Sequence, residues 1–236
     1  MFQKDKLAEK STKELMNDYS LYNQRLWLNK SEIYDFFMTI NTIGYLPLVI
    51  HRTMTEMIEL SDDKRVLDLC TGTGGQLRSI GVVCREKRVK PFVVALDMSL
   101  EMMQKARIKA EKKRLSVDFV QSDATMTSFR DESFDVVCCS LALHDMPLDL
   151  IEKVIHEVHR ILKKGGMFIS LEISKPEYSK LIQFLMSLHL MFDSYYSMKN
   201  WTINFGEFLA ERGFVNVTRR VMGFRTFQLV RAFKAK

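Results

Sequence analysis

The chain has 236 residues, of which 47% are hydrophobic and 27% charged, and its formal net charge is +6. This length and apolar content predict one α/β domain with a sizeable core and a modest cap, and argue against a second full domain. Lys and Arg are scattered except for two short runs, at 86–90 and 111–114, which we interpret as solvated helix ends. Aromatic residues do not interleave with these charges, so nucleic acid is not an expected partner.

The first sixty residues have helical rather than strand periodicity, as in Ile33, Phe36, Phe37 and Ile40. We expect residues 1–60 to form an N-terminal helical cap and residues 61–236 to form the main domain. The first residues are charged, and no uninterrupted apolar run approaches about 18 residues. The sequence therefore predicts no transmembrane segment and a cytoplasmic protein.

The rest of the chain alternates between strand and helix patterns. We predict strand 66–70, helix 75–86, strand 92–96, helix 100–113, strand 117–121, strand 134–139, helix 149–162, strand 167–173 and helix 177–196, then a short helix closed by Gly213 and two final strands. Ser99 is the expected N-cap of helix 100–113, and Gly165 and Gly166 are expected to stop helix 149–162. Such βαβ alternation implies a parallel sheet with right-handed crossovers.

The cysteines and histidines give no sign of a disulfide or metal framework. None of the cysteines has C-x-x-C spacing, and all lie in or beside apolar segments, which predicts free thiols in a reducing compartment (Cys70, Cys84, Cys138 and Cys139). His156 and His159 do not match the H-E-x-x-H pattern of zinc sites. We therefore predict no metal site, and we expect Asp135, inside an apolar strand, to make a structural hydrogen bond.

The segment VLDLCTGTGG, at 66–75, joins an apolar strand to a glycine-rich turn. Its three glycines allow the backbone to turn sharply and to approach a ligand closely. Asp97 ends the next apolar run, at 92–96, where its carboxylate suits both hydroxyls of a ribose. The spacing predicts an adenosine-containing cofactor.

Two such cofactors fit the turn. A dinucleotide fingerprint requires a small third residue, whereas Leu77 occupies that position here. Asp68 lies in the approach to the loop, where a negative charge repels a pyrophosphate but attracts the ammonium of an amino acid. These features favour S-adenosylmethionine over NAD.

Three later segments continue the pattern of an apolar strand with an adjoining turn: SVDFVQSDAT at 116–125, FDVVCCSLALHDM at 134–146 and KKGGMFISLEISKP at 163–176. The series resembles class I S-adenosylmethionine-dependent methyltransferases over roughly residues 45–236. LEISKP at 171–176 and GFVNVTRR at 213–220 resemble most the ubiquinone/menaquinone-pathway C-methyltransferase group. After the fourth strand, however, the chain has residues 142–146 as Ala-Leu-His-Asp-Met, where that group usually has Gly-Leu-Arg-Asn-Val.

This resemblance implies an α/β Rossmann-like methyltransferase fold: a mostly parallel seven-stranded sheet of order 3-2-1-4-5-7-6, with helices on both faces and the N-terminal helical cap. It also implies that Asp68 and the glycine loop hold the methionine moiety, Asp97 the ribose, Met98 and Ala124 the adenine faces, and Asp123 the adenine amino group. The candidate cofactor-binding residues are Asp68, Cys70, Thr71, Gly72, Thr73, Gly74, Asp97, Met98, Asp123, Ala124 and Ser140.

His144 is the histidine that follows the fourth strand at the expected catalytic mouth, so we predict that it acts as an acid/base or acceptor-orienting group. A solvent-facing loop residue beside Pro147 is an equally good interpretation. His51 and His189 have no partner visible in the sequence.

We predict methyl transfer to a small or medium apolar acceptor, aromatic molecules included. Apolar and aromatic residues of the flanking helices either roof this acceptor or are plain core (Phe36, Phe37, Tyr45, Met191, Phe192, Tyr195, Tyr196 and Trp201). The alternatives are an S-adenosylmethionine-binding regulatory protein without turnover and an NAD-dependent oxidoreductase. The expected partner is the small-molecule acceptor, and the sequence leaves a homodimer open.

Overall fold

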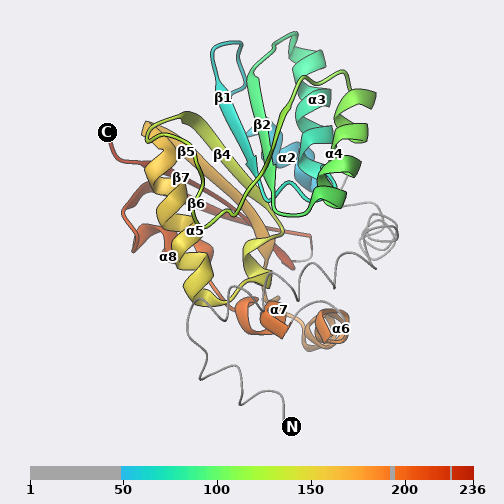
Figure 1. Ribbon diagram of the computed structural model, residues 1–236. Helices are drawn as coiled ribbons and strands as arrows, with labels where there is room; N and C mark the ends of the chain where they lie inside the picture. The colour runs from blue at the N-terminus through green and yellow to red at the C-terminus, as the bar shows by residue number, and fades with distance from the viewer. Residues whose placement is uncertain (1–48, 192–194, 224) are drawn as a thin grey trace.

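The computed structural model describes residues 49–191, 195–223 and 225–236 (Figure 1). Most of the predicted cap, residues 1–48, lies outside the described residues, so the domain boundary after residue 60 stays a prediction. Within the described ranges, no helix is both long and apolar enough to cross a bilayer.

The described elements alternate as the sequence predicts. In chain order they are α2 (His51–Glu56), β1 (Arg65–Leu69), α3 (Gly75–Lys87), β2 (Phe92–Asp97), α4 (Leu100–Lys112), β3 (Asp118–Gln121), β4 (Phe134–Ser140), the 3-10 helix η2 (Leu143–Asp145), α5 (Leu148–Ile161), β5 (Leu162–Ile173), α6 (Lys180–Met191), α7 (Tyr195–Asn200), α8 (Phe205–Ala210), β6 (Phe214–Met222) and β7 (Phe227–Lys234). From the first predicted strand through helix 149–162, the observed ends lie within about one residue of the predicted ones, which is the usual scatter of helix and strand ends.

The strands form one seven-stranded sheet of order β3-β2-β1-β4-β5-β7-β6, which confirms the predicted fold and strand order. The first five strands of the chain pair in parallel, whereas β7 runs antiparallel to β5 and to β6. The chain order reverses between β1 and β4. In open sheets of this kind, ligands bind beyond the carboxyl ends of the strands at such a reversal.

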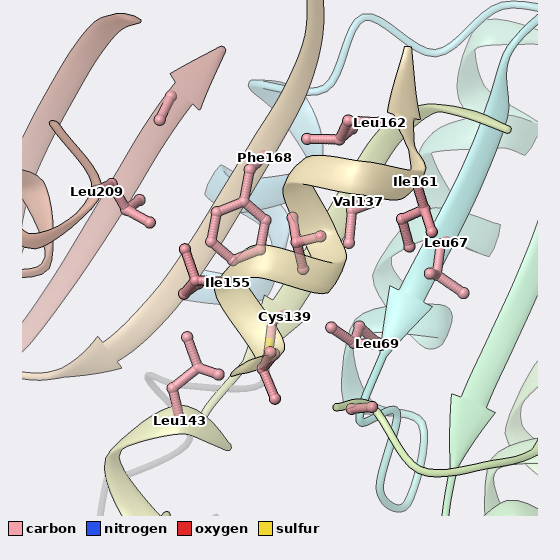
Figure 2. Close-up of a cluster of buried hydrophobic side chains, with 14 of the residues drawn as sticks. Leu67, Leu69, Val137, Cys139, Leu143, Ile155, Ile161, Leu162, Phe168 and Leu209 are labelled. Atoms are coloured by element: carbon pink, nitrogen blue, oxygen red, sulfur yellow. The ribbon is translucent and has the colours of Figure 1, made fainter. Parts of the chain in front are cut away.

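Helices cover both faces of the sheet (Figure 1). Alternate residues of the buried strands point to opposite faces, so that Leu67 and Leu69 join one core cluster while Val66 joins the other. Figure 2 shows the first cluster, to which Ile155 of α5, Phe168 of β5 and Leu67 of β1 all belong. The second cluster contains apolar residues of α2, α3 and α4.

The described end of the predicted cap is part of this second cluster. Ile50, Met54 and Ile58 are fully buried and pack with Val66 and Leu77. Helix α2 is therefore fixed to the sheet through its apolar side.

Several local predictions are confirmed. The Ser99 hydroxyl accepts a hydrogen bond from Met102 N at 3.3 Å and caps α4. Asp135 makes the expected structural hydrogen bond, because its Oδ2 accepts from Arg65 N at 2.9 Å and Lys163 Nζ donates to both of its oxygens. All four cysteines are free thiols.

Two predicted element boundaries are wrong. Gly165 and Gly166 do not stop a helix: α5 ends at Ile161, and both glycines lie inside β5, next to an irregularity in its pairing with β4. A Cβ on Gly166 would lie 2.8 Å from Lys163 O, so close backbone packing explains that glycine. The predicted helix 177–196 corresponds to two helices, α6 and α7, with residues 192–194 outside the described residues.

Helix α7 lies at the edge of the sheet where β4 and β5 end (Figure 1). Asn200 Nδ2 donates to His144 O at 3.0 Å and to Met146 O at 2.7 Å, which ties α7 to η2. Trp201, a predicted roof residue, is buried against Ile173 in a small third cluster and is ordinary core.

Candidate active site

The turn after β1 has a strained backbone, and part of it packs closely against α4. Cys70, Gly72 and Gly74 have φ of 55°, 51° and 80°, in the left-handed region that glycine tolerates best. A Cβ on Gly74 would lie 2.7 Å from Ala106 Cα, so the approach of α4 also requires glycine there. A Cβ on Gly72 would meet nothing within 4 Å, so the loop is open at that residue. The turn is therefore sharply curved, packed against α4 on one side and open at Gly72.

Asp68 lies beneath this turn and is 1% exposed. Its Oδ2 accepts from Thr71 Oγ1 at 2.6 Å, and its Oδ1 is 3.6 Å from the Cys138 thiol. Burial raises the pKa of Asp68 to about 7. These two hydrogen-bond partners, Thr71 and Cys138, are neutral, so a cationic ligand group near this carboxyl would offset the cost of ionising it.

Asp97, at the end of β2, connects two loops through its carboxylate. Oδ2 accepts from Gly72 N at 2.8 Å and Oδ1 accepts from Ser99 N at 2.9 Å. Burial raises its pKa, while the hydrogen bonds from the Ser99, Gly72 and Met98 amides act in the opposite direction. Because a carboxylate has about four lone-pair sites, this one retains capacity for a further donor, which suits a ribose hydroxyl.

The other candidate residues of this side lie in the loops around Asp97. Asp123 follows β3, and its Oδ1 accepts from Thr125 N at 2.8 Å in a local turn. Ala124 is buried in the first core cluster, while Met98 is half-buried and its carbonyl accepts from Gln121 Nε2 at 3.0 Å. These positions are compatible with an adenine between them, and their roles remain predictions.

Thr71 and Thr73 are both buried in the turn. The Thr71 hydroxyl donates to Asp68, as described above, and Lys109 Nζ of α4 donates to Thr73 Oγ1 at 3.0 Å. Cys70 is half-buried. The side chains of this loop thus hold its shape. The amides of Thr71, Gly72 and Gly74 also donate within the protein, to Leu96 O, Asp97 Oδ2 and Thr71 O, so Asp68 is the polar group of the turn that suits a ligand.

The residues present fit the amino-acid and ribose parts of S-adenosylmethionine. A buried carboxyl suits an ammonium, an open glycine turn admits close backbone approach, and a half-buried carboxylate at the next strand end suits a ribose hydroxyl. A pyrophosphate, by contrast, would bring negative charge to a buried acidic side chain.

His144 lies in η2 beyond β4 and is 4% exposed, so its interpretation as a solvent-facing loop residue is wrong. Its Nδ1 is 2.6 Å from Glu172 Oε2, and its Nε2 is 3.7 Å from Asp145 Oδ1. A carboxylate accepts but cannot donate, so Glu172 favours the tautomer that carries its proton on Nδ1.

Glu172 is the functional candidate that sequence reasoning missed. It is fully buried near the end of β5 and accepts from the backbone amides of Leu143 and His144, each at 3.2 Å. Asp145 accepts from the Ser197 hydroxyl of α7. A glutamate in a largely apolar strand segment, residues 168–173, was the available signal, because a buried charge requires partners.

His51 showed no partner in the sequence, but it has one in the structure. It is 8% exposed on α2, and its Nε2 is 2.9 Å from the Ser140 hydroxyl at the end of β4. The structure thus brings one predicted residue, Ser140, into contact with a histidine 89 positions earlier in the chain. His156 is exposed and His159 packs edge-on against Phe214, and the described residues contain no group of three or more metal-ligating side chains.

Comparison with known proteins finds methyltransferases among the proteins that this chain resembles. Residues 66–166 match the methyltransferase domain family. The chain is 28% identical over 186 residues to an uncharacterised methyltransferase of Synechocystis, covering 77% of this chain and 81% of that protein. It is 34% identical over 113 residues to the demethylmenaquinone methyltransferase of Thermus thermophilus, which is 48% of this chain and 49% of that protein. The match therefore spans about half the length of the Thermus protein.

Among solved structures, phosphoethanolamine N-methyltransferase 2 of Haemonchus contortus, in complex with S-adenosylmethionine, has a TM-score of 0.58 and 16% identity. The match covers 80% of this chain and 53% of that one, and at this identity it supports the shared fold. The match of residues 66–166 to a methyltransferase domain family favours S-adenosylmethionine over NAD as the cofactor.

Proposed function

Because residues 66–166 match a methyltransferase domain family, we propose that the chain uses S-adenosylmethionine to methylate a small or medium apolar acceptor, aromatic molecules included. The observation that carries the proposal is the pair of acidic residues at neighbouring strand ends, Asp68 and Asp97, on either side of an open glycine turn.

The bound cofactor supplies an electrophilic methyl group on a sulfonium, so the protein needs mainly to align the acceptor and to exclude water. Asp68 binds the ammonium of the amino-acid part, and Asp97 binds the ribose hydroxyls while it holds Gly72 N. Met98, Ala124 and Asp123 surround the adenine. These roles follow from the positions of the residues around the turn and from the family resemblance.

On the acceptor side, we propose that His144 takes the proton that the acceptor loses. Glu172 Oε2, 2.6 Å from Nδ1, orients the ring, and we assign the proton transfer to Nε2, which lies 3.7 Å from Asp145 Oδ1. This arrangement of an imidazole oriented by a buried carboxylate is one that acid/base catalysis uses on unrelated folds. A proton acceptor matters for a phenol, an acidic carbon or a protonated amine, each of which must lose a proton on methylation.

The acceptor class is supported by the relatives. Demethylmenaquinone methyltransferases recur among them, at modest identity and over part of their length. A reduced, demethylated quinone is therefore the first acceptor to assay, and simple phenols are the second.

Two measurements test the proposal in sequence. Calorimetry with S-adenosylhomocysteine and with NAD tests the cofactor, and only the first is expected to bind. Incubation with methyl-labelled cofactor and each acceptor, followed by mass spectrometry, is then expected to show a product heavier by one methylene unit. Binding of S-adenosylhomocysteine without any labelled product from these acceptors or from a metabolite extract would favour the regulatory protein instead.

A further inference from the structure

His51 joins two parts of the cofactor side that are distant in sequence. Its imidazole lies directly over the first residue of α3, because a Cβ on Gly75 would lie 2.9 Å from Cε1 and 3.4 Å from Nδ1. Its Nε2 is 2.9 Å from Ser140 Oγ at the end of β4. The ring therefore bridges the glycine turn after β1 and the end of the neighbouring strand, which is the reversal point of the sheet.

Buried hydrogen bonds also connect α3 to the backbone of α2 at His51. Gln76 Nε2 donates to Thr55 Oγ1 at 2.9 Å, and Thr55 Oγ1 donates to His51 O at 2.8 Å. Gln76 and Thr55 are 2% and 0% exposed, so these hydrogen bonds lie in the interior. Apolar residues of α2 already anchor that helix, so packing alone does not require polar side chains here.

The charges around the turn are separated. On one side is the acidic side chain of Asp68, buried beneath the turn. On the other side begins α3, a helix of 13 residues whose N-cap, Gly74, offers no side-chain cap and whose first turn contains no acidic residue. The amide end of a helix carries partial positive charge and favours an anion, and His51 lies over this end.

This distribution complements an amino acid in its zwitterionic form, whose ammonium and carboxylate are separated by one carbon. We propose that His51, oriented by Ser140, contacts the carboxylate of the cofactor's amino-acid end. The assignment rests on the proposed function, because it places the methionine part of the cofactor beside Asp68. It makes His51 the residue through which the protein distinguishes cofactors with a carboxylate from those without one.

Three ligands separate the parts of this site in binding calorimetry. S-adenosylhomocysteine has both charged groups, its decarboxylated analogue keeps only the ammonium, and 5′-methylthioadenosine has neither. His51→Ala is expected to weaken S-adenosylhomocysteine about tenfold, in line with the loss of a hydrogen bond to a charged group, and to change binding of the other two less than about twofold.

Two control variants give different patterns across the same ligands. Asp68→Asn is expected to weaken S-adenosylhomocysteine and its decarboxylated analogue but not 5′-methylthioadenosine. Asp97→Ala is expected to weaken all three by a similar factor, because each contains the ribose. His51→Gln is expected to fold like the parent, by thermal unfolding without ligand, and to recover part of the lost affinity.

The outcomes that overturn the assignment are distinct. If His51→Ala and His51→Gln weaken S-adenosylhomocysteine and the decarboxylated analogue by the same factor, His51 only anchors α2. If neither variant changes binding of any ligand, His51 has no role in the cofactor site. If the parent binds none of the three ligands, the proposed function fails first and the assignment fails with it.

Discussion

The carboxyl edge of the sheet has two halves that treat their acidic residues differently. In the nucleotide half, where β1 and β2 end, Asp68 and Asp97 accept hydrogen bonds from the surrounding loops and retain capacity for a ligand. In the histidine half, where β4 and β5 end, Glu172 accepts from two amides and the His144 imidazole, and Asp145 accepts from Ser197. The first half is arranged for an external partner, and the second is largely satisfied within the protein.

This difference shows how burial directs a polar group toward binding or toward folding. A carboxylate that the protein already surrounds with donors stabilises the native state, and its loss leaves those donors unpaired. A carboxyl buried with few donors instead costs free energy until a ligand supplies the missing charge. Variants of the histidine half should therefore affect stability or turnover, and variants of the nucleotide half should affect cofactor affinity.

The largest expected effect is on folding. Glu172→Ala should lower the free energy of unfolding by about 3 to 5 kcal/mol, because it leaves buried partners of a charged group unpaired. Urea unfolding measures this value. Asp131→Ala is the matched control: its carboxylate pairs with Arg160 but is 75% exposed, so the cost should stay below about 1 kcal/mol. Equal, small costs for the two variants would contradict a structural role of Glu172 in the histidine half.

The second expected effect is on turnover. His144→Ala should lower the rate of methyl transfer about 100-fold or more, which corresponds to roughly 2.7 kcal/mol, while it changes affinity for S-adenosylhomocysteine less than about twofold. A variant that keeps most of its rate would leave His144 as part of the folding network alone.

The third expected effect is on the nucleotide half. Asp97→Ala should weaken binding of S-adenosylhomocysteine by about 1.5 to 3 kcal/mol, the range for hydrogen bonds to a charged acceptor. Calorimetry measures the affinity, and circular dichroism checks that the variant is folded. Affinity equal to that of the parent would remove the ribose assignment.

The sequence predicted the nucleotide half better than the histidine half, for a physical reason. Asp68, Gly72 and Asp97 lie in or directly after two buried strands, so parallel pairing alone brings them to one edge. The strand order itself came from resemblance rather than from periodicity, and the structure confirms it. The site roles assigned to these residues remain predictions.

The histidine half depends on contacts between distant segments. Glu172 and His144 are 28 positions apart, and Asn200 reaches His144 O from 56 positions away. No local spacing encodes such pairs. The contact of His51 with Ser140, 89 positions apart, was invisible for the same reason. Gly165 and Gly166 were misassigned because close backbone packing and helix termination require the same residue.

The smallest expected effect is the pH dependence that ionisation of Asp68 gives to stability and to cofactor affinity. Burial raises its pKa from 3.8 to about 7, so without ligand the folded protein holds a proton that the unfolded chain releases near pH 4. The free energy of unfolding due to this group therefore falls as the pH rises from about 4 to 7, because in that range the unfolded state binds fewer protons. A ligand ammonium beside Asp68 has the opposite effect on this carboxyl, since it stabilises the ionised form over the protonated form.

Affinity for S-adenosylhomocysteine should consequently rise with pH, although stability without ligand falls. A carboxyl with a pKa of about 7 is about one-tenth ionised at pH 6, so binding there should be roughly tenfold weaker than at pH 8, or about 1.4 kcal/mol. Other groups titrate in this range, so the measurement is the difference between the parent and Asp68→Asn, each titrated by calorimetry at pH 6, 7 and 8. The variant should bind more weakly at pH 8 and lack the rise. If parent and variant change in parallel with pH, Asp68 does not bind the ammonium, and the buried carboxyl of the nucleotide half would then resemble Glu172 in serving the fold rather than the ligand.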